Sequence, residues 1–144
     1  PLKQIREEFR YEIQVLDDFI ELEKIRYGEK LQLIFNKSID NESHPIAPLI
    51  LLPFVENAFK HGASESRFGS FINIDLKLDH SMLCFKIENS NSQDYATIKS
   101  ENIGLNNIRR QLELLYPEHK LEIDNKNNTF SVSLKINLDK DASV

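Results

Sequence analysis

The sequence predicts a two-layer α/β sandwich of the α+β kind, in which a mixed sheet of about five strands carries helices on one face. Segments that alternate apolar and polar residues are the first observation, because this pattern is typical of half-buried strands. Two shorter segments of helical periodicity between the strands are the second. A longer helical pattern at the N-terminus is extra to the sandwich. The alternation also predicts that the other sheet face is wet or only partly covered.

The composition fits one globular domain. The chain has 144 residues, enough for a substantial core, with 40% hydrophobic and 28% charged residues. A net charge of −5 argues against a general nucleic-acid binder and against an anionic-membrane binder. No apolar run is long enough to span a bilayer, and no signal-peptide pattern opens the chain. The opening "PLKQIREEF" is already helical in pattern and indicates a piece of a longer protein.

The N-terminal pattern predicts a helix over residues 3–27. Apolar residues recur every three to four positions, with charged residues between them. Gly28 ends the pattern, and Lys24 and Arg26 precede it, as helix C-termini prefer. The apolar stripe consists of Ile5, Phe9, Ile13, Leu16 and Ile20.

The next stretch predicts a strand followed by a helix. Residues 31–39, "LQLIFNKSI", alternate and predict the strand, and the polar "DNESHP" predicts a loop. Pro48 suits the first turn of the helix, which runs through residues 51–62 and breaks at Gly62.

Residues 71–78 and 82–89 alternate in polarity and predict a hairpin. Cys84 lies in this hairpin and is the single cysteine, so an intrachain disulfide is excluded and a small core residue is expected. The polar residues 89–102 lack periodicity and predict a loop.

The C-terminal part predicts a helix and a second hairpin. "GLNNIRRQLELLYP" is helical in pattern and ends at Pro117. "KLEIDN" and "TFSVSLKINL" then predict two strands that turn around "NKNN", and the tail "DKDASV" is expected to fray.

The helix over residues 51–62, "LLPFVENAFKHG", combines a wide apolar face with a compact polar one. Glu56, Asn57, Lys60 and His61 fall within an arc of roughly 140° on an ideal helical wheel. Such a face is usually the solvated side of an amphipathic helix. Asn is a poor helix-interior residue, however, and the rest of this helix is very apolar, which favours a concave site instead.

Three segments resemble LytS-type sensor histidine kinases in order and spacing. They are "FIELEKIRYGEKLQL", "LILLPFVENAFKHG" and "NIGLNNIRRQLELLYP". These kinases belong to the GHKL ATPase superfamily, which shares the Bergerat ATP-binding fold. The second segment resembles the N box of that fold, and the third resembles its second glycine motif. The resemblance covers nearly the whole chain and implies the cytoplasmic catalytic domain of a membrane-anchored bacterial protein histidine kinase.

The resemblance also implies a site for ATP and Mg²⁺. Asn57 would coordinate the Mg²⁺ that bridges the phosphates, and an amide oxygen suits this hard ion. Lys60 would neutralise phosphate charge, and His61 would hydrogen-bond phosphate or the nucleotide edge. Glu56 and Lys60 would be the catalytic residues. Glu56 would hold a metal-bound water or orient Lys60. Gly104 begins a helix whose first amides would meet phosphate oxygens. The other expected cofactor-binding residues are Asn89, Leu105 and Asn107.

The sequence departs from the family pattern in both glycine motifs. Asn89 stands where the first motif has an Asp that accepts the adenine amino hydrogen, and the Gly-x-Gly is absent. Asn102 stands where the second motif has a glycine. Residues 90–102 would form a short ATP lid, expected to be mobile without nucleotide. Pro53 replaces the acid that activates water in many superfamily ATPases, which suits a kinase with slow ATP hydrolysis.

The phosphoacceptor is expected outside this chain, because His44 lies in a loop and lacks the Phe-x-Phe-Asn neighbours of the family. Residues 1–28 would be the end of the dimerisation region or a connector, and residues 29–144 the catalytic ATP-binding domain. We therefore expect no autophosphorylation by the fragment alone and a homodimer through the N-terminal stripe. The expected partners are a response regulator and a phosphoacceptor helix of the same or the partner chain, without nucleic-acid or direct membrane contact.

Two other interpretations remain open at this point. The altered glycine motifs favour a degenerate GHKL module that binds nucleotide weakly or not at all and acts through protein contacts. A plain α/β interaction domain, with a polar helix face that is only solvated, is the third.

Overall fold

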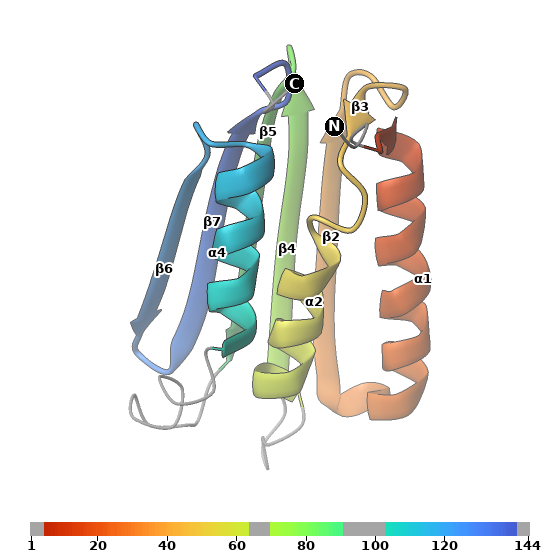
Figure 1. Ribbon diagram of the computed structural model, residues 1–144. Coiled ribbons are helices and arrows are strands. Elements are labelled where there is room, and N and C mark those ends of the chain that lie inside the picture. The colour runs from red at the N-terminus through yellow and green to blue at the C-terminus, as the bar shows by residue number, and fades with distance from the viewer. Residues whose placement is uncertain (1–4, 64–69, 91–102, 141–144) are drawn as a thin grey trace.

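The computed structural model describes residues 5–63, 70–90 and 103–140. Five strands form one mixed sheet in the order β2–β4–β5–β7–β6, and helices lie over one of its faces (Figure 1). The strands are β2 (Leu31–Ile39), β4 (Ser70–Asp79), β5 (Met82–Ser90), β6 (Lys120–Lys126) and β7 (Thr129–Asn137). The α-helices are α1 (Phe9–Tyr27), α2 (Leu52–Ala58) and α4 (Ile103–Leu115). The predicted fold class, including the long N-terminal helix, is confirmed.

The sheet is mixed because β2 and β4 run parallel, whereas the other neighbouring strands run antiparallel. Both predicted hairpins are present. β4 turns into β5 through His80 and Ser81, with φ angles of 49° and 67°, and β6 turns into β7 through Asn127 and Asn128, with φ angles of 53° and 59°. Two successive left-handed residues match the right-handed twist of the strands, which explains the tight connections.

The core lies between the helices and the inner face of the sheet. Alternate residues of β4, β5 and β7 are buried, and the residues between them face outward. The prediction that Cys84 is a core residue is wrong. Cys84 lies between the buried Leu83 and Phe85, so its side chain is on the outer face, where it is only partly covered.

Helix α1 begins at Phe9, later than predicted. Glu7–Glu8 form a short strand, β1, which pairs antiparallel with β3 (Pro45–Ile46). Because these two residues are in a strand, the helix can begin only after them. The helix ends as predicted at Gly28, whose φ of 66° suits glycine and whose N–H donates to the Lys24 carbonyl.

The apolar stripe of α1 packs inside its own chain. Phe9, Leu16 and Ile20 are at most 3% exposed, and Ile13 is partly buried against the same core. Ile5 is exposed. Phe9, Leu16 and Ile20 are therefore already covered within the chain, and the homodimer expected through this stripe stays a prediction. The stripe is wide because α1 contacts both α2 and β3.

Helix α2 is shorter than predicted and changes its winding. It begins at Leu52, and Pro53 rather than Pro48 occupies its first turn. After Ala58 the chain continues as a wider π-helical turn, η2 (Phe59–Ala63). Such turns are rare and occur frequently at functional sites.

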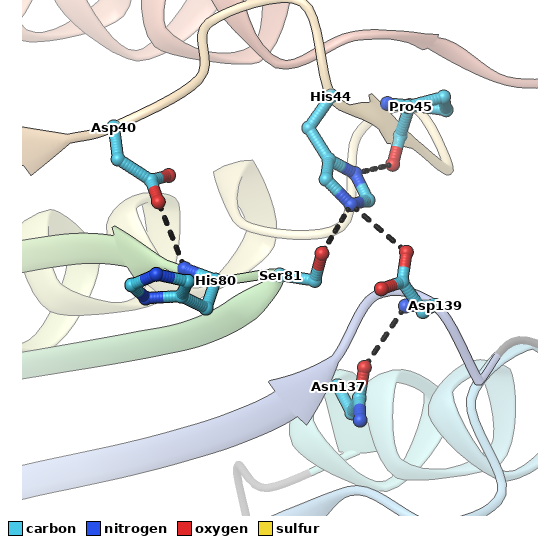
Figure 2. A network of polar contacts seen from close by, with 7 residues as sticks. All are labelled: Asp40, His44, Pro45, His80, Ser81, Asn137 and Asp139. Atoms are coloured by element: carbon cyan, nitrogen blue, oxygen red, sulfur yellow. Dashed lines mark hydrogen bonds and ion pairs between the residues drawn. The ribbon is translucent and has the colours of Figure 1, made fainter.

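A polar network joins three loops at one end of the sheet (Figure 2). The His44 Nδ1 donates to the Pro45 carbonyl at 2.9 Å, and Nε2 lies 2.9 Å from Ser81 Oγ and 3.1 Å from Asp139 Oδ1. The His80 N–H donates to Asp40 Oδ2 at 2.8 Å. The loop after β2 is thereby tied to the β4–β5 turn and to the residues after β7. His44 lies in this loop, as predicted.

Candidate nucleotide-binding site

A cavity of about 550 Å³ lies where α1 ends, α2 passes into η2 and α4 begins. These segments meet at the end of the molecule opposite the His44 network (lower end of Figure 1). The volume is in the range of small-molecule sites, about 300–1,000 Å³. The lining residues are Phe19, Glu23, Arg26, Tyr27, Pro53, Glu56, Asn57, Phe59, Lys60, His61, Gly104 and Ile108.

The four polar residues predicted to share a helix face all line this cavity. Asn57 is partly buried, His61 is 8% exposed, and Glu56 and Lys60 are exposed. A merely solvated helix face would project into bulk water. The arrangement instead agrees with the expectation of a concave site.

Aromatic packing from α1 fixes the η2 turn. The Phe59 ring is buried, with its centroid 5.6 Å from the Phe19 ring in an edge-on arrangement and 6.1 Å from the stacked Tyr27 ring. Arg26 lies over the Tyr27 ring at 5.4 Å. Aromatic pairs of this kind contribute about 0.5–1.5 kcal/mol each beyond their buried area. Phe59 therefore anchors the two neighbouring residues, Lys60 and His61, at the cavity.

The N-terminus of α4 forms another wall. Leu105, Ile108 and Leu112 are buried and hold this helix on the core, while Gly104 lines the cavity. A Cβ at Gly104 would meet nothing within 4 Å, so packing alone does not require glycine there. The free N–H groups of a helix N-terminus favour anions. The Leu105 side chain belongs to the core, and Asn107 is exposed and is not among the lining residues.

Asn89 lies at the end of β5 and is not among the lining residues either. It is 1% exposed, and its Nδ2 donates to the Ser90 carbonyl at 3.0 Å. The predicted lid follows directly, but residues 91–102, which include Asn102, lie outside the described residues.

The sequence prediction missed the contribution of α1 to the cavity. Phe19, Glu23, Arg26 and Tyr27 come from this helix, and Ile108 comes from α4. A signal for the α1 residues was present, because all four lie in "FIELEKIRYGEKLQL", the first of the three segments that resemble the kinase family. Helical periodicity alone presented them as ordinary helix residues.

The charges at the cavity suit a ligand that combines a metal ion and an anion. Glu56 and Asn57 offer the oxygen ligands that Mg²⁺ prefers. Arg26, Lys60 and the α4 amides offer positive charge and hydrogen-bond donors to phosphate. The residues present therefore fit a magnesium-bound phosphate compound.

The fold is that of the catalytic domains of histidine kinases. The nucleotide-free catalytic domain of histidine kinase ThkA aligns with a TM-score of 0.66 over 96% of this chain and 99% of that chain, at 15% identity. The histidine kinase domain of the blue-light activated kinase from Erythrobacter litoralis EL346 has a TM-score of 0.66 over 96% of this chain and 66% of that chain, at 14% identity.

Sequence similarity extends to further proteins, over different shares of this chain. The sensor protein kinase HptS of Staphylococcus aureus (strain USA300) is 22% identical over 133 residues, which are 84% of this chain and 26% of HptS. The uncharacterized protein YwpD of Bacillus subtilis (strain 168) is 33% identical over 69 residues, which are 48% of this chain and 24% of YwpD. The chain thus spans about a quarter of the length of these relatives. No protein-family model matches the chain. Among its described helices, none has the length and apolar character needed to cross a membrane.

Proposed function

We propose that this chain is the MgATP-binding catalytic domain of a two-component sensor histidine kinase. The observation that carries the proposal is the cavity in which Glu56, Asn57, Lys60 and His61 face the N-terminus of α4. The fold shared with histidine kinase catalytic domains and the similarity to the sensor kinase HptS support it. The γ-phosphoryl group of ATP would pass to a histidine outside this chain.

Asn57 is the residue we assign to Mg²⁺, which neutralises phosphate charge when bound. Lys60 and the first amides of α4 would hold the phosphates, and Glu56 would orient Lys60 or a metal-bound water. The buried His61 would contribute a hydrogen bond to phosphate or to the nucleotide edge. Phosphoryl transfer depends mainly on positioning and charge stabilisation, which this set of residues can supply. The lack of an acid at Pro53 is consistent with a phosphoryl group kept for a histidine rather than lost to water.

We further propose the LytS-type subfamily, because three segments of this chain match its pattern in order and spacing. A response regulator is the expected receiver of the phosphoryl group. Histidine kinase ThkA, whose structure is similar to this chain, has been crystallised in complex with the response regulator protein TrrA. The phosphoacceptor helix, the dimer contact and a membrane anchor would belong to other parts of the full protein. Its catalytic domain would then lie on the cytoplasmic side.

A degenerate binding module is the second candidate. Asn89 favours it, because this side chain is buried and is not among the residues that line the cavity. Calorimetric titration of the wild-type chain with ATP, with and without Mg²⁺, separates the two candidates. A catalytic domain should bind ATP far more tightly when Mg²⁺ is present. No binding, or equal weak binding in both titrations, would favour the degenerate module.

A further inference from the structure

Glu12 is a buried carboxylate that holds the chain immediately before α2. The side chain lies on α1 and is 2% exposed. Its Oε2 accepts a hydrogen bond from the Leu49 N–H and its Oε1 from the Leu51 N–H, each at 2.9 Å. A glutamate is almost never fully buried unless its charge has such partners.

The two amides bonded to Glu12 belong to the entry of α2, where a helix needs partners for its free N–H groups. Leu51 is the N-cap residue and makes no side-chain cap hydrogen bond. Leu49 has a φ of 59°, a left-handed conformation that costs a leucine energy. Glu12 thus provides from another helix the cap that Leu51 lacks, and it holds Leu49 in its strained conformation.

Helix α1 therefore holds the α2–η2 segment at both ends. Glu12 binds the entry, and Phe19 and Tyr27 pack on Phe59 at the exit. Asn57 lies between these two attachments and lines the cavity. A shift of the α2 entry against α1 would rotate or tilt the polar face that holds Asn57, since the exit is fixed by aromatic packing.

We propose that Glu12 is a positioning residue of the nucleotide site, which sets the orientation of the Asn57 face through the N-terminus of α2. The proposal rests on the proposed function, because it assigns Glu12 an effect on MgATP binding. Glu12 itself is not among the residues that line the cavity. The alternative is that the carboxylate stabilises the fold without affecting the site.

The test compares Glu12→Gln with wild type and with Glu21→Gln as a matched control. Gln keeps the size of the side chain but loses its charge and one of its two acceptor oxygens. Glu21 is an exposed acid of the same helix, and it forms a long ion pair with Lys24 at 3.7 Å. Two readouts are needed at a temperature where every variant is folded. The first is the set of backbone amide resonances over residues 54–61 without ligand, and the second is the MgATP dissociation constant.

The expected result is displaced resonances over residues 54–61 and MgATP affinity lowered by about tenfold in Glu12→Gln, with Glu21→Gln unchanged. In an Asn57→Ala background, Glu12→Gln should cost little further affinity, because both changes act through one residue. Glu12→Asp keeps the charge on a side chain one methylene shorter and should give a smaller loss. This variant also keeps the test valid if Glu12→Gln does not fold.

The proposal is overturned if the variants lower the melting temperature while the resonances over residues 54–61 and the MgATP affinity stay at wild-type values. It is also overturned if Glu12→Gln and Asn57→Ala lower the affinity additively. If the wild type does not bind MgATP, the proposed function fails. The ligand-free resonances then decide whether Glu12 positions the Asn57 face.

Discussion

The Tyr116 hydroxyl accepts a hydrogen bond from the Ala47 N–H at 2.9 Å, and both residues are buried. Tyr116 directly follows α4, and Ala47 lies in the segment that leads into α2. The contact therefore joins the C-terminal end of α4 to the segment that enters α2, and α2 and α4 both contribute residues to the cavity. Together with the Glu12 cap, it leaves the α2 entry attached to both neighbouring helices.

Replacing Tyr116 with Phe should destabilise the protein by about 1–3 kcal/mol, because the buried Ala47 N–H would lose its acceptor. Urea unfolding measures this difference. Tyr11→Phe is the matched control, since Tyr11 is 54% exposed, and it should change stability little. Equal stability of Tyr116→Phe and wild type would show that the hydrogen bond does not hold the two helices.

Replacing Leu16 with Ala should lower the free energy of unfolding by about 2–5 kcal/mol, because this side chain is fully buried in the core of its own chain. Leu22→Ala, at a position that is 67% exposed on the same helix, should have a much smaller effect. Light scattering before unfolding should give the same mass for both variants and the wild type. A wild-type dimer that Leu16→Ala dissociates would contradict the observed packing of α1.

The stability of the protein should depend on pH through Glu12. Desolvation by burial raises the pKa of Glu12, and the hydrogen bonds from the Leu51, Leu49 and Ile50 backbone oppose this only in part. The charge of Glu7 adds to the rise in pKa. Because the folded pKa lies above the ordinary value of 4.5, the folded state binds more protons in the interval between them. The contribution of this group is thus complete below pH 4.5 and is lost as the pH rises through the folded pKa.

Urea midpoints of wild type and Glu12→Gln across this pH interval test the sign. The stability of the wild type, relative to the variant, should decrease as the pH rises. A relative stability that is constant, or that increases with pH, would be inconsistent with the raised pKa of the buried carboxyl.

Asn57→Ala should weaken MgATP binding far more than metal-free ATP binding, because the amide oxygen is assigned to the metal. The fold should survive, since Asn57 lines the cavity and is only partly buried. Asn36→Ala is a matched control on the exposed side of the edge strand β2, where the amide donates to Asp75. Titration calorimetry of both variants measures the effect. Equal losses for ATP with and without Mg²⁺ would speak against the metal assignment.

Much of the fold was predictable because the strands and the α4 helix follow simple periodicity. Buried and more exposed residues alternate strictly along β4, β5 and β7. The left-handed positions of the hairpin turns include Ser81, Asn127 and Asn128, which are residue types common in turns. The start of α1 was not predictable, since the pairing of Glu7–Glu8 with Pro45–Ile46 is a long-range contact. The face of Cys84 could have been inferred from its buried neighbours Leu83 and Phe85.

The candidate site was predictable where it lies on one helix. The spacing of Glu56, Asn57, Lys60 and His61 placed them on one face, and all four line the cavity. The contribution of Arg26 and Tyr27 was not, because it depends on α1 packing against Phe59. The role of Glu12 was hidden as well, since a glutamate between Tyr11 and Ile13 looks like an ordinary helix charge until its partners are known.

Residue-resolved NMR titration of the wild-type chain with MgATP tests whether nucleotide binds in this cavity. We expect saturable shifts at Asn57, Lys60, His61 and Gly104, with Lys77 and Ser133 on the opposite face of the sheet unchanged. The same shifts should be strongly reduced when Mg²⁺ is removed. The absence of shifts at saturating MgATP, or shifts centred on Lys77 and Ser133, would contradict the assignment of this cavity as the nucleotide site.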